Sequence, residues 1–175
     1  MLLLLQCLPL PLPPVHPACL SRVPAGFSLE RLLELTQREP VTLLFVLSEH
    51  NNLFGAFLTR AWAQRLEGRW FGDGDSFLFS LRPKFKVYRW VGVSAADVGQ
   101  RAAADAGTSS NRFQRADSKH LYVGGGSGGM GLSLAGDFSC TSSVSETFAN
   151  VPLNGEHELF RAKEVEVYGL SGDRM

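Results

Sequence analysis

A glycine run in the second half of the chain has the spacing of a phosphate-binding loop. Gly124, Gly126 and Gly129 form GxGxxG directly after an apolar segment typical of a strand. A dinucleotide site also needs a helix that opens at the third glycine, because its amino terminus holds the pyrophosphate. The residues that follow, GLSLAGDF, are typical of a strand, and no Gly-Lys-Ser or Gly-Lys-Thr sequence indicates a P-loop. The pattern therefore favours a glycine-rich hairpin and implies no nucleotide cofactor.

Two nearby aspartates resemble the start of a calcium-binding loop. Asp73 and Asp75 lie in the sequence Asp-Gly-Asp-Ser. An EF-hand loop needs a third oxygen ligand at the next alternate position, then a glycine and a distal glutamate. Phe77 occupies that third position. We therefore expect a turn in which the two carboxylates accept hydrogen bonds from nearby backbone groups, and we expect no metal site.

Two groupings of residues contain the types needed for nucleophilic catalysis. Ser48, Glu49 and His50 are consecutive, and neighbours on a strand or turn point to opposite sides, which disfavours a triad. Cys140 and His157 could form a thiol–imidazole pair, but the Ser and Thr neighbours of Cys140 supply no positive charge to stabilise a thiolate. The favoured interpretation of Cys140 is a semi-buried cysteine whose thiol has a hydrogen-bond partner. The histidines, whose spacing predicts no metal centre, are His16, His50, His120 and His157.

Composition disfavours several classes of function. The 175 residues carry 17 Lys+Arg and 17 Asp+Glu, so the formal net charge is zero. That balance lacks the long-range field expected of a nucleic-acid-binding protein. The sequence contains no run of about 18 apolar residues, so we expect no membrane span. Cys7, Cys19 and Cys140 have no metal-binding spacing and an odd count, which favours reduced thiols inside a cell.

Hydrophobic periodicity predicts one amphipathic helix and many short strands. The helix is predicted over residues 28–39, with Ser28 as its N-cap and Pro40 as its stop. Continuous or alternating apolar runs predict strands at 41–47, 53–58, 77–81, 86–91, 121–123, 132–134 and 159–170, and residues 148–153 form a further apolar element. We therefore predict an α+β, mostly β fold in which two antiparallel sheets pack as a sandwich with one or two flanking helices.

A chain of this length is expected to form one domain with a separate leader and tail. Residues 1–25 are rich in Pro and Leu, and we expect them to be disordered or atypical, because proline fixes φ and lacks an amide donor. As a signal peptide they lack a positive first region. Residues 26–170 form the predicted domain, with a long exposed loop at 94–119. Residues 171–175 form a tail.

Six short blocks of sequence occur in a fixed order. They are FGAF (54–57), WFGDGDSFLFSL (70–81), VYRWVG (87–92), GGGSGGMGLSLAGDF (124–138), TFAN (147–150) and EVEVYG (164–169). In this order and spacing they resemble the TLDc domain family over about residues 26–170. The segment at 94–119 is most similar to TLDc domains joined to a TBC, Rab-GAP-like domain. Asp75 stands where the family usually has Glu, and Tyr168 where it usually has Trp.

The resemblance implies a two-sheet sandwich flanked by helices. It also implies roles in oxidative-stress resistance and membrane trafficking, and association with the vacuolar proton ATPase. It brings no settled catalytic mechanism. Acidic positions shared by family members map to Asp75, Asp137 and Glu166, which are candidate functional groups. Turn capping or the satisfaction of buried amides is an equally good explanation of these three carboxylates.

Three hypotheses follow for the function of the chain. The first is a non-enzymatic interaction module in the cytoplasm, at vesicle or endolysosomal membranes, whose loops bind a protein partner such as vacuolar ATPase subunits. The second is an antioxidant or redox-sensing activity through Cys140 or an acidic cluster. The third is that the chain is a fragment or atypical isoform of a longer TBC–TLDc protein, whose truncated first sheet would leave an unpaired strand edge.

Overall fold

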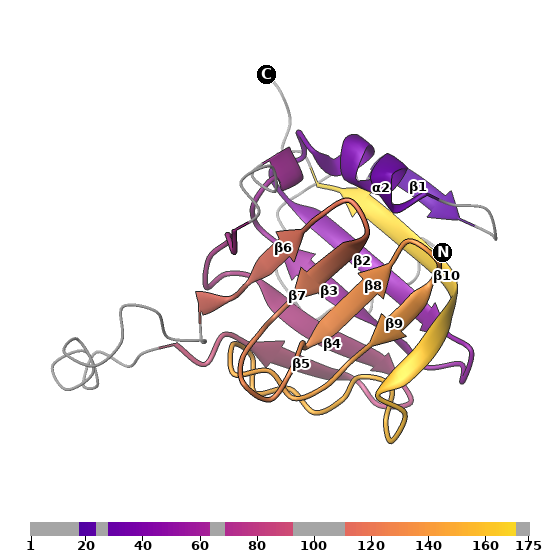
Figure 1. Cartoon of the computed structure of the whole chain (residues 1–175), viewed down its shortest axis with the longest axis vertical. Coiled ribbons are helices and arrows are strands. Elements are labelled where there is room, and N and C mark those ends of the chain that lie inside the picture. The colour runs from indigo at the N-terminus through magenta and orange to yellow at the C-terminus, as the bar shows by residue number, and fades with distance from the viewer. Residues whose placement is uncertain (1–17, 24–27, 64–68, 93–110, 171–175) are drawn as a thin grey trace, which may run out of the picture.

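The computed structural model of the chain describes residues 18–23, 28–63, 69–92 and 111–170. Within these residues the chain is mostly β, with one helix (Figure 1). The elements are β1 (Ala18–Val23), α2 (Leu29–Thr36), β2 (Thr42–Ser48), β3 (Leu53–Leu58), β4 (Phe77–Arg82), β5 (Lys86–Arg89), β6 (Gln114–Ala116), β7 (His120–Val123), β8 (Leu132–Ala135), β9 (Ser139–Thr141) and β10 (Leu159–Gly169). The prediction of a mostly β fold with a flanking helix is confirmed.

The ten strands of the described residues belong to one hydrogen-bonded sheet. Its order is β5-β4-β3-β2-β10-β9-β8-β7-β6, and β1 also pairs with β10. The 11-residue strand β10 joins the two halves, because residues 159–161 pair with β9 while residues 162–169 pair with β2. Every pairing is antiparallel. Two separate sheets are therefore not confirmed, because one long strand makes the ladder continuous.

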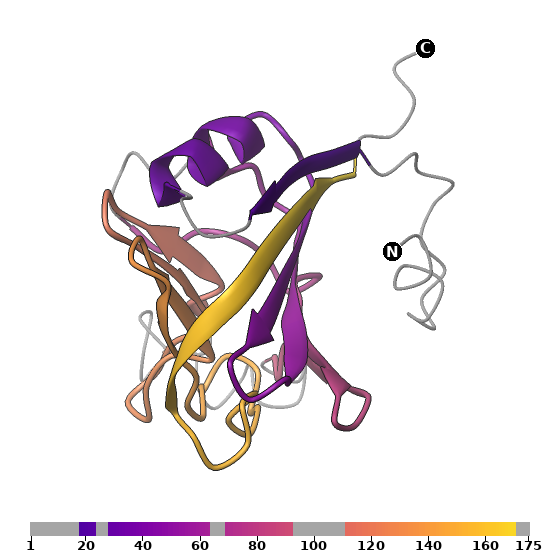
Figure 2. The ribbon, with the colours of Figure 1, turned by 90° about the vertical axis from the view of Figure 1, so that its right-hand side faces the viewer.

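The two halves of the sheet share one large apolar core. Figure 2 shows β10 running diagonally between the halves and α2 lying across one end. Phe54 and Leu78 from one half and Leu121 and Leu134 from the other belong to the same buried cluster. Removal of this apolar surface from water is the main term that favours the fold. The core thus fixes how the loops at the sheet edges lie relative to one another.

Helix α2 packs its leucines onto that core. Leu29, Leu32 and Leu33 are all buried. The hydroxyl of Thr36 donates to the carbonyl of Leu32 at 2.8 Å, in the last turn. The backbone N–H of Gln37 then bonds three residues back, as a tight final turn does. The helix therefore ends three residues before the predicted boundary at Glu39.

A second apolar cluster lies on the outer face of the half that contains β2 to β5. We call it the outer cluster; its buried members are Leu43, Phe45, Phe77, Phe79, Tyr168 and Leu170. The ring of Phe45 contacts the rings of Phe79 and Tyr168 edge-on, with centroid distances of 5.4 and 5.8 Å. Strand β2 is thus apolar on both faces, which explains its continuous apolar run in the sequence.

The structure extends the sheet into segments predicted to lie outside it. Residues 18–23 belong to the predicted leader but form β1, whose backbone pairs with residues 165–169 of β10. Residues 114–116 belong to the predicted 94–119 loop but form β6, which pairs with β7. The rest of the leader (1–17 and 24–25), most of the loop (94–110) and the tail (171–175) lie outside the described residues, with Cys7 and His16.

No helix in the part of the chain that the structure describes is long and apolar enough to cross a bilayer.

Candidate functional site

The glycine run forms the connection between β7 and β8, which are antiparallel neighbours. The backbone N–H of Gly125 donates to the Thr147 hydroxyl at 3.2 Å, and that of Ser127 donates to the Glu146 carboxylate at 3.0 Å. The side-chain hydrogen bond from Ser127 lowers the pKa of Glu146. These backbone donors are therefore directed at the 146–147 segment of this chain, and the hairpin prediction is confirmed.

The two aspartates of the Asp-Gly-Asp-Ser turn have different surroundings. Asp73 accepts a hydrogen bond from the Asp75 N–H at 3.2 Å and another from the Thr59 hydroxyl. Its second oxygen pairs with Arg60 at 2.8 Å. The predicted turn is therefore confirmed for Asp73. The carboxylate of Asp75 is exposed and accepts no hydrogen bond within the described residues.

Asp137 and Cys140 both lie on the β8–β9 hairpin, but one is exposed and the other buried. Asp137 accepts hydrogen bonds from the hydroxyl and the N–H of Ser139, at 2.6 and 3.0 Å, and these bonds lower its pKa. Cys140 is 1 % exposed, and its Sγ lies 3.5 Å from the Phe138 carbonyl oxygen. Burial raises the pKa of Cys140 to about 12. The thiol is therefore protonated at neutral pH and a weak nucleophile.

Glu166 lies in the middle of β10 among the side chains of the outer cluster. It is buried and accepts a hydrogen bond from the Tyr168 hydroxyl at 2.8 Å. Asp75, by contrast, lies in the turn before β4, and Asp137 lies in the β8–β9 hairpin. The three carboxylates therefore occupy three different places in the fold, and the structure does not bring them together as a cluster.

The structure assembles neither the Ser48–Glu49–His50 grouping nor the Cys140–His157 pair as a catalytic arrangement. The hydroxyl of Ser48 accepts a backbone N–H from the following turn at 3.2 Å, and Glu49 accepts a backbone N–H of β10 at 3.0 Å. The ring of His50 stacks on that of His157, with centroids 4.1 Å apart. His157 therefore packs on another histidine, whereas Cys140 faces the core. Among the described residues, no group of three or more His, Cys, Asp or Glu side chains could hold a metal ion.

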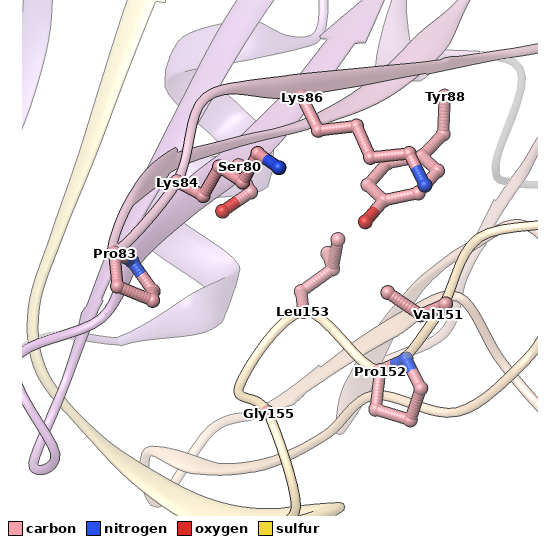
Figure 3. A pocket seen from close by; sticks show the side chains of 9 residues that line it. All are labelled: Ser80, Pro83, Lys84, Lys86, Tyr88, Val151, Pro152, Leu153 and Gly155. Carbon is pink, nitrogen blue, oxygen red and sulfur yellow. The ribbon is translucent and has the colours of Figure 1, made fainter.

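The structure also contains a pocket that the sequence reasoning missed. It has a volume of about 310 Å³ and lies between the β4–β5 hairpin and residues 151–155 (Figure 3). Its lining residues are Ser80, Pro83, Lys84, Lys86, Tyr88, Val151, Pro152, Leu153 and Gly155. The one signal in the sequence is a run of four cations without a carboxylate over residues 82–89. The opposite wall is more than 60 residues away along the chain, so only the fold reveals it.

Comparison with known proteins gives one consistent result. The sequence matches the family described as TLDc domain over residues 19–171. It is 36% identical to GTPase-activating protein skywalker of Drosophila melanogaster over 150 residues, which cover 80% of this chain and 24% of that protein. It is 26% identical to TBC1 domain family member 24 of Xenopus laevis over 181 residues, covering 83% of this chain and 32% of that protein. It is also 26% identical to Oxidation resistance protein 1 of Xenopus laevis over 147 residues, covering 83% of this chain and 15% of that protein. The chain thus spans less than a third of the length of each of these relatives.

Proposed function

The chain belongs to the TLDc domain family, and from this premise we propose that it is a non-catalytic interaction module linked to oxidative-stress resistance and membrane trafficking. We further propose that its partner is the vacuolar proton ATPase and that it acts in the cytoplasm, peripherally, at vesicle or endolysosomal membranes. The observation that carries the proposal is the family match over residues 19–171, which includes nearly all of the described fold. Loops on a rigid scaffold are the usual carriers of protein recognition.

The chemistry of the candidate residues supports an interaction role over a redox role. A peroxide-reactive cysteine needs a thiolate and access to solvent. Cys140 has neither, because it is 1 % exposed and burial raises its pKa to about 12. The carboxylates of Asp137 and Glu166 accept hydrogen bonds from the neighbouring Ser139 and Tyr168. These contacts favour a structural role for both acids.

Affinity capture from cell lysate tests the proposed partner. The tagged full chain is the bait, and the TLDc domain of Oxidation resistance protein 1 is the reference bait under the same conditions. We expect both to enrich vacuolar ATPase subunits. Recovery of those subunits by the reference bait alone would refute the proposed partner.

A survival assay tests the absence of thiol chemistry. Cells that express the Cys140→Ser chain should survive peroxide as well as cells that express the unchanged chain, provided both proteins accumulate equally. A loss of protection in the variant at equal abundance would restore the redox hypothesis.

A further inference from the structure

The hydroxyl groups of two largely buried residues point into the pocket beside the β4–β5 hairpin. Ser80 and Tyr88 lie on adjacent strands and are each only 7 % exposed. Figure 3 shows both hydroxyl oxygens directed toward the space that faces Leu153. Within the described residues, neither hydroxyl forms a hydrogen bond. Burial raises the pKa of Tyr88, so its hydroxyl remains a donor at neutral pH. Neither oxygen is among the fully buried polar atoms of the described residues that lack a partner, so both can be reached from the pocket and are available to a ligand that enters it.

Two lysines add positive charge to the same pocket. Lys84 and Lys86 line it, and in the part of the chain that the structure describes no carboxylate forms an ion pair with either. The ammonium of Lys86 lies 4.8 Å from the centroid of the Tyr88 ring, which favours its position at the pocket. The lysine ammonium groups can only donate hydrogen bonds, and the hydroxyls of Ser80 and Tyr88 can each donate one. The pocket therefore favours an anionic acceptor, and a carboxylate is the commonest one on proteins.

The opposite wall of the pocket is apolar and held in place. Val151, Pro152 and Leu153 line it, and Val151 is 52 % exposed. The side-chain amide of Asn150 donates to the carbonyl of Val151 at 3.0 Å, and the N–H of Leu153 donates to the Ser142 hydroxyl at 2.8 Å. These bonds fix the wall before any ligand arrives, which lowers the conformational entropy lost on binding.

We propose that this pocket binds a short acidic peptide segment of a partner protein, with a glutamate or aspartate beside Lys84, Lys86 and the two hydroxyls and a neighbouring apolar side chain against Val151 and Leu153. The proposal rests on the proposed function as an interaction module and names the chemistry of the segment that the module binds. A concave pocket lined by hydroxyl and ammonium donors favours a peptide over the surface of an anionic membrane, because a peptide side chain can enter it.

Fluorescence anisotropy with the purified full chain tests the proposal. The probe is a labelled peptide with the sequence Ser-Glu-Glu-Leu-Glu-Glu-Ser, and its control has glutamine in place of each glutamate. We expect saturable binding of the acidic peptide, and affinity at least roughly tenfold lower for the glutamine peptide. The combined change Lys84→Glu and Lys86→Glu should weaken binding of the acidic peptide by a similar factor. Tyr88→Phe, which keeps the ring and removes the donor, should weaken it about threefold or more.

A matched pair of variants separates the pocket from the overall charge. Arg38→Glu combined with Lys119→Glu changes the net charge by the same amount at exposed positions away from the pocket. This pair should leave the affinity within about twofold of the unchanged chain. Circular dichroism and a thermal melt of every variant establish that each is folded. Equal weakening by both pairs, or equal affinity for the two peptides, would show charge attraction without a site and would overturn the proposal.

Two further outcomes also decide the matter. The proposal is wrong if the chain shows no saturable binding of the acidic peptide. It is equally wrong if the two lysines support binding only to vesicles of phosphatidylcholine and phosphatidylserine. Because the assay uses a synthetic peptide, its failure can be told apart from failure of the proposed function. Peptide binding without capture of the vacuolar ATPase would overturn only the named partner, and capture without peptide binding would overturn only the pocket.

Discussion

Cys140 should react with a thiol reagent about a thousandfold more slowly than an ordinary free cysteine at the same pH. Only the thiolate reacts, and burial raises the pKa of Cys140 from 9.0 to about 12. At pH 8 the thiolate fraction therefore falls from roughly one in ten to roughly one in ten thousand. The thiol is also 1 % exposed, so a reagent gains access only when the β8–β9 hairpin opens.

The assay is the absorbance change with dithiobisnitrobenzoate at pH 8. The chain carries Cys7→Ser and Cys19→Ser, so that Cys140 is its single cysteine. Glutathione gives the rate of a free thiol, and the same chain unfolded in guanidinium shows that Cys140 reacts once it is exposed. We expect the folded chain to react about a thousandfold or more slowly than either control. A rate for the folded chain within about tenfold of glutathione would refute both the burial argument and the structural role of this thiol.

Three further changes test other parts of the structure. Gly55→Ala would place a Cβ 1.8 Å from a main-chain oxygen of β2, so urea titration should show a free energy of unfolding lower by more than about 3 kcal/mol. Its control, Gly155→Ala, has open space at φ +71° and should lose only about 1 kcal/mol; equal losses would contradict the packing argument. Tyr168→Phe removes the hydroxyl that donates to Glu166 and should lower the free energy of unfolding by about 1–2 kcal/mol; an unchanged value would contradict a stabilising bond. The pKa of Cys140 is raised from 9.0 to about 12 in the folded state, so its contribution to the free energy of unfolding is complete below pH 9.0 and is lost as the pH rises toward about 12. By pH 10 that contribution should have fallen by about 1.4 kcal/mol. Cys140→Ala should lack that part of the pH dependence, and identical pH profiles for the two chains would contradict the raised pKa.

The strands that could be predicted from the sequence are those with strong apolar patterns. The predicted strands at 41–47, 53–58 and 77–81 agree with β2, β3 and β4 to within one residue at each end. These strands are buried, so their periodicity reports the core directly. The sequences of β1, β6 and β9 show no comparable apolar pattern. These strands are recognised only by the pairing of their backbones with neighbouring strands. The same limit hid the continuity of the sheet, since nothing in the composition of β10 shows that it pairs on both sides.

The surroundings of the candidate site residues could not be predicted from the sequence. Turn capping is one role expected for Asp137, and in the structure it accepts hydrogen bonds from the N–H and the hydroxyl of Ser139 in the β8–β9 hairpin. The depth of Cys140 and the partner of Glu166 depend on packing from distant segments. The pocket depends on such packing entirely, because Tyr88 and Leu153 come together only through the fold.

The sequence blocks that carry the family resemblance build the core beside the pocket and also supply its Ser80 and Tyr88. A Cβ at Gly131 would lie 2.6 Å from Leu78 and 3.0 Å from the Asn150 side chain, so the glycine run, the FLF strand and the TFAN block pack directly on one another. Asn150 in turn holds the carbonyl of Val151 at 3.0 Å. These blocks therefore fix where the 151–155 wall lies. Lys84 and Lys86 lie between two blocks, so a substitution at either position can change the charge of the pocket without disturbing that packing. We therefore expect the blocks to supply the scaffold and the two hydroxyl donors, and the segments at 82–86 and 151–155 to set the charge and shape of the peptide that the proposed site accepts.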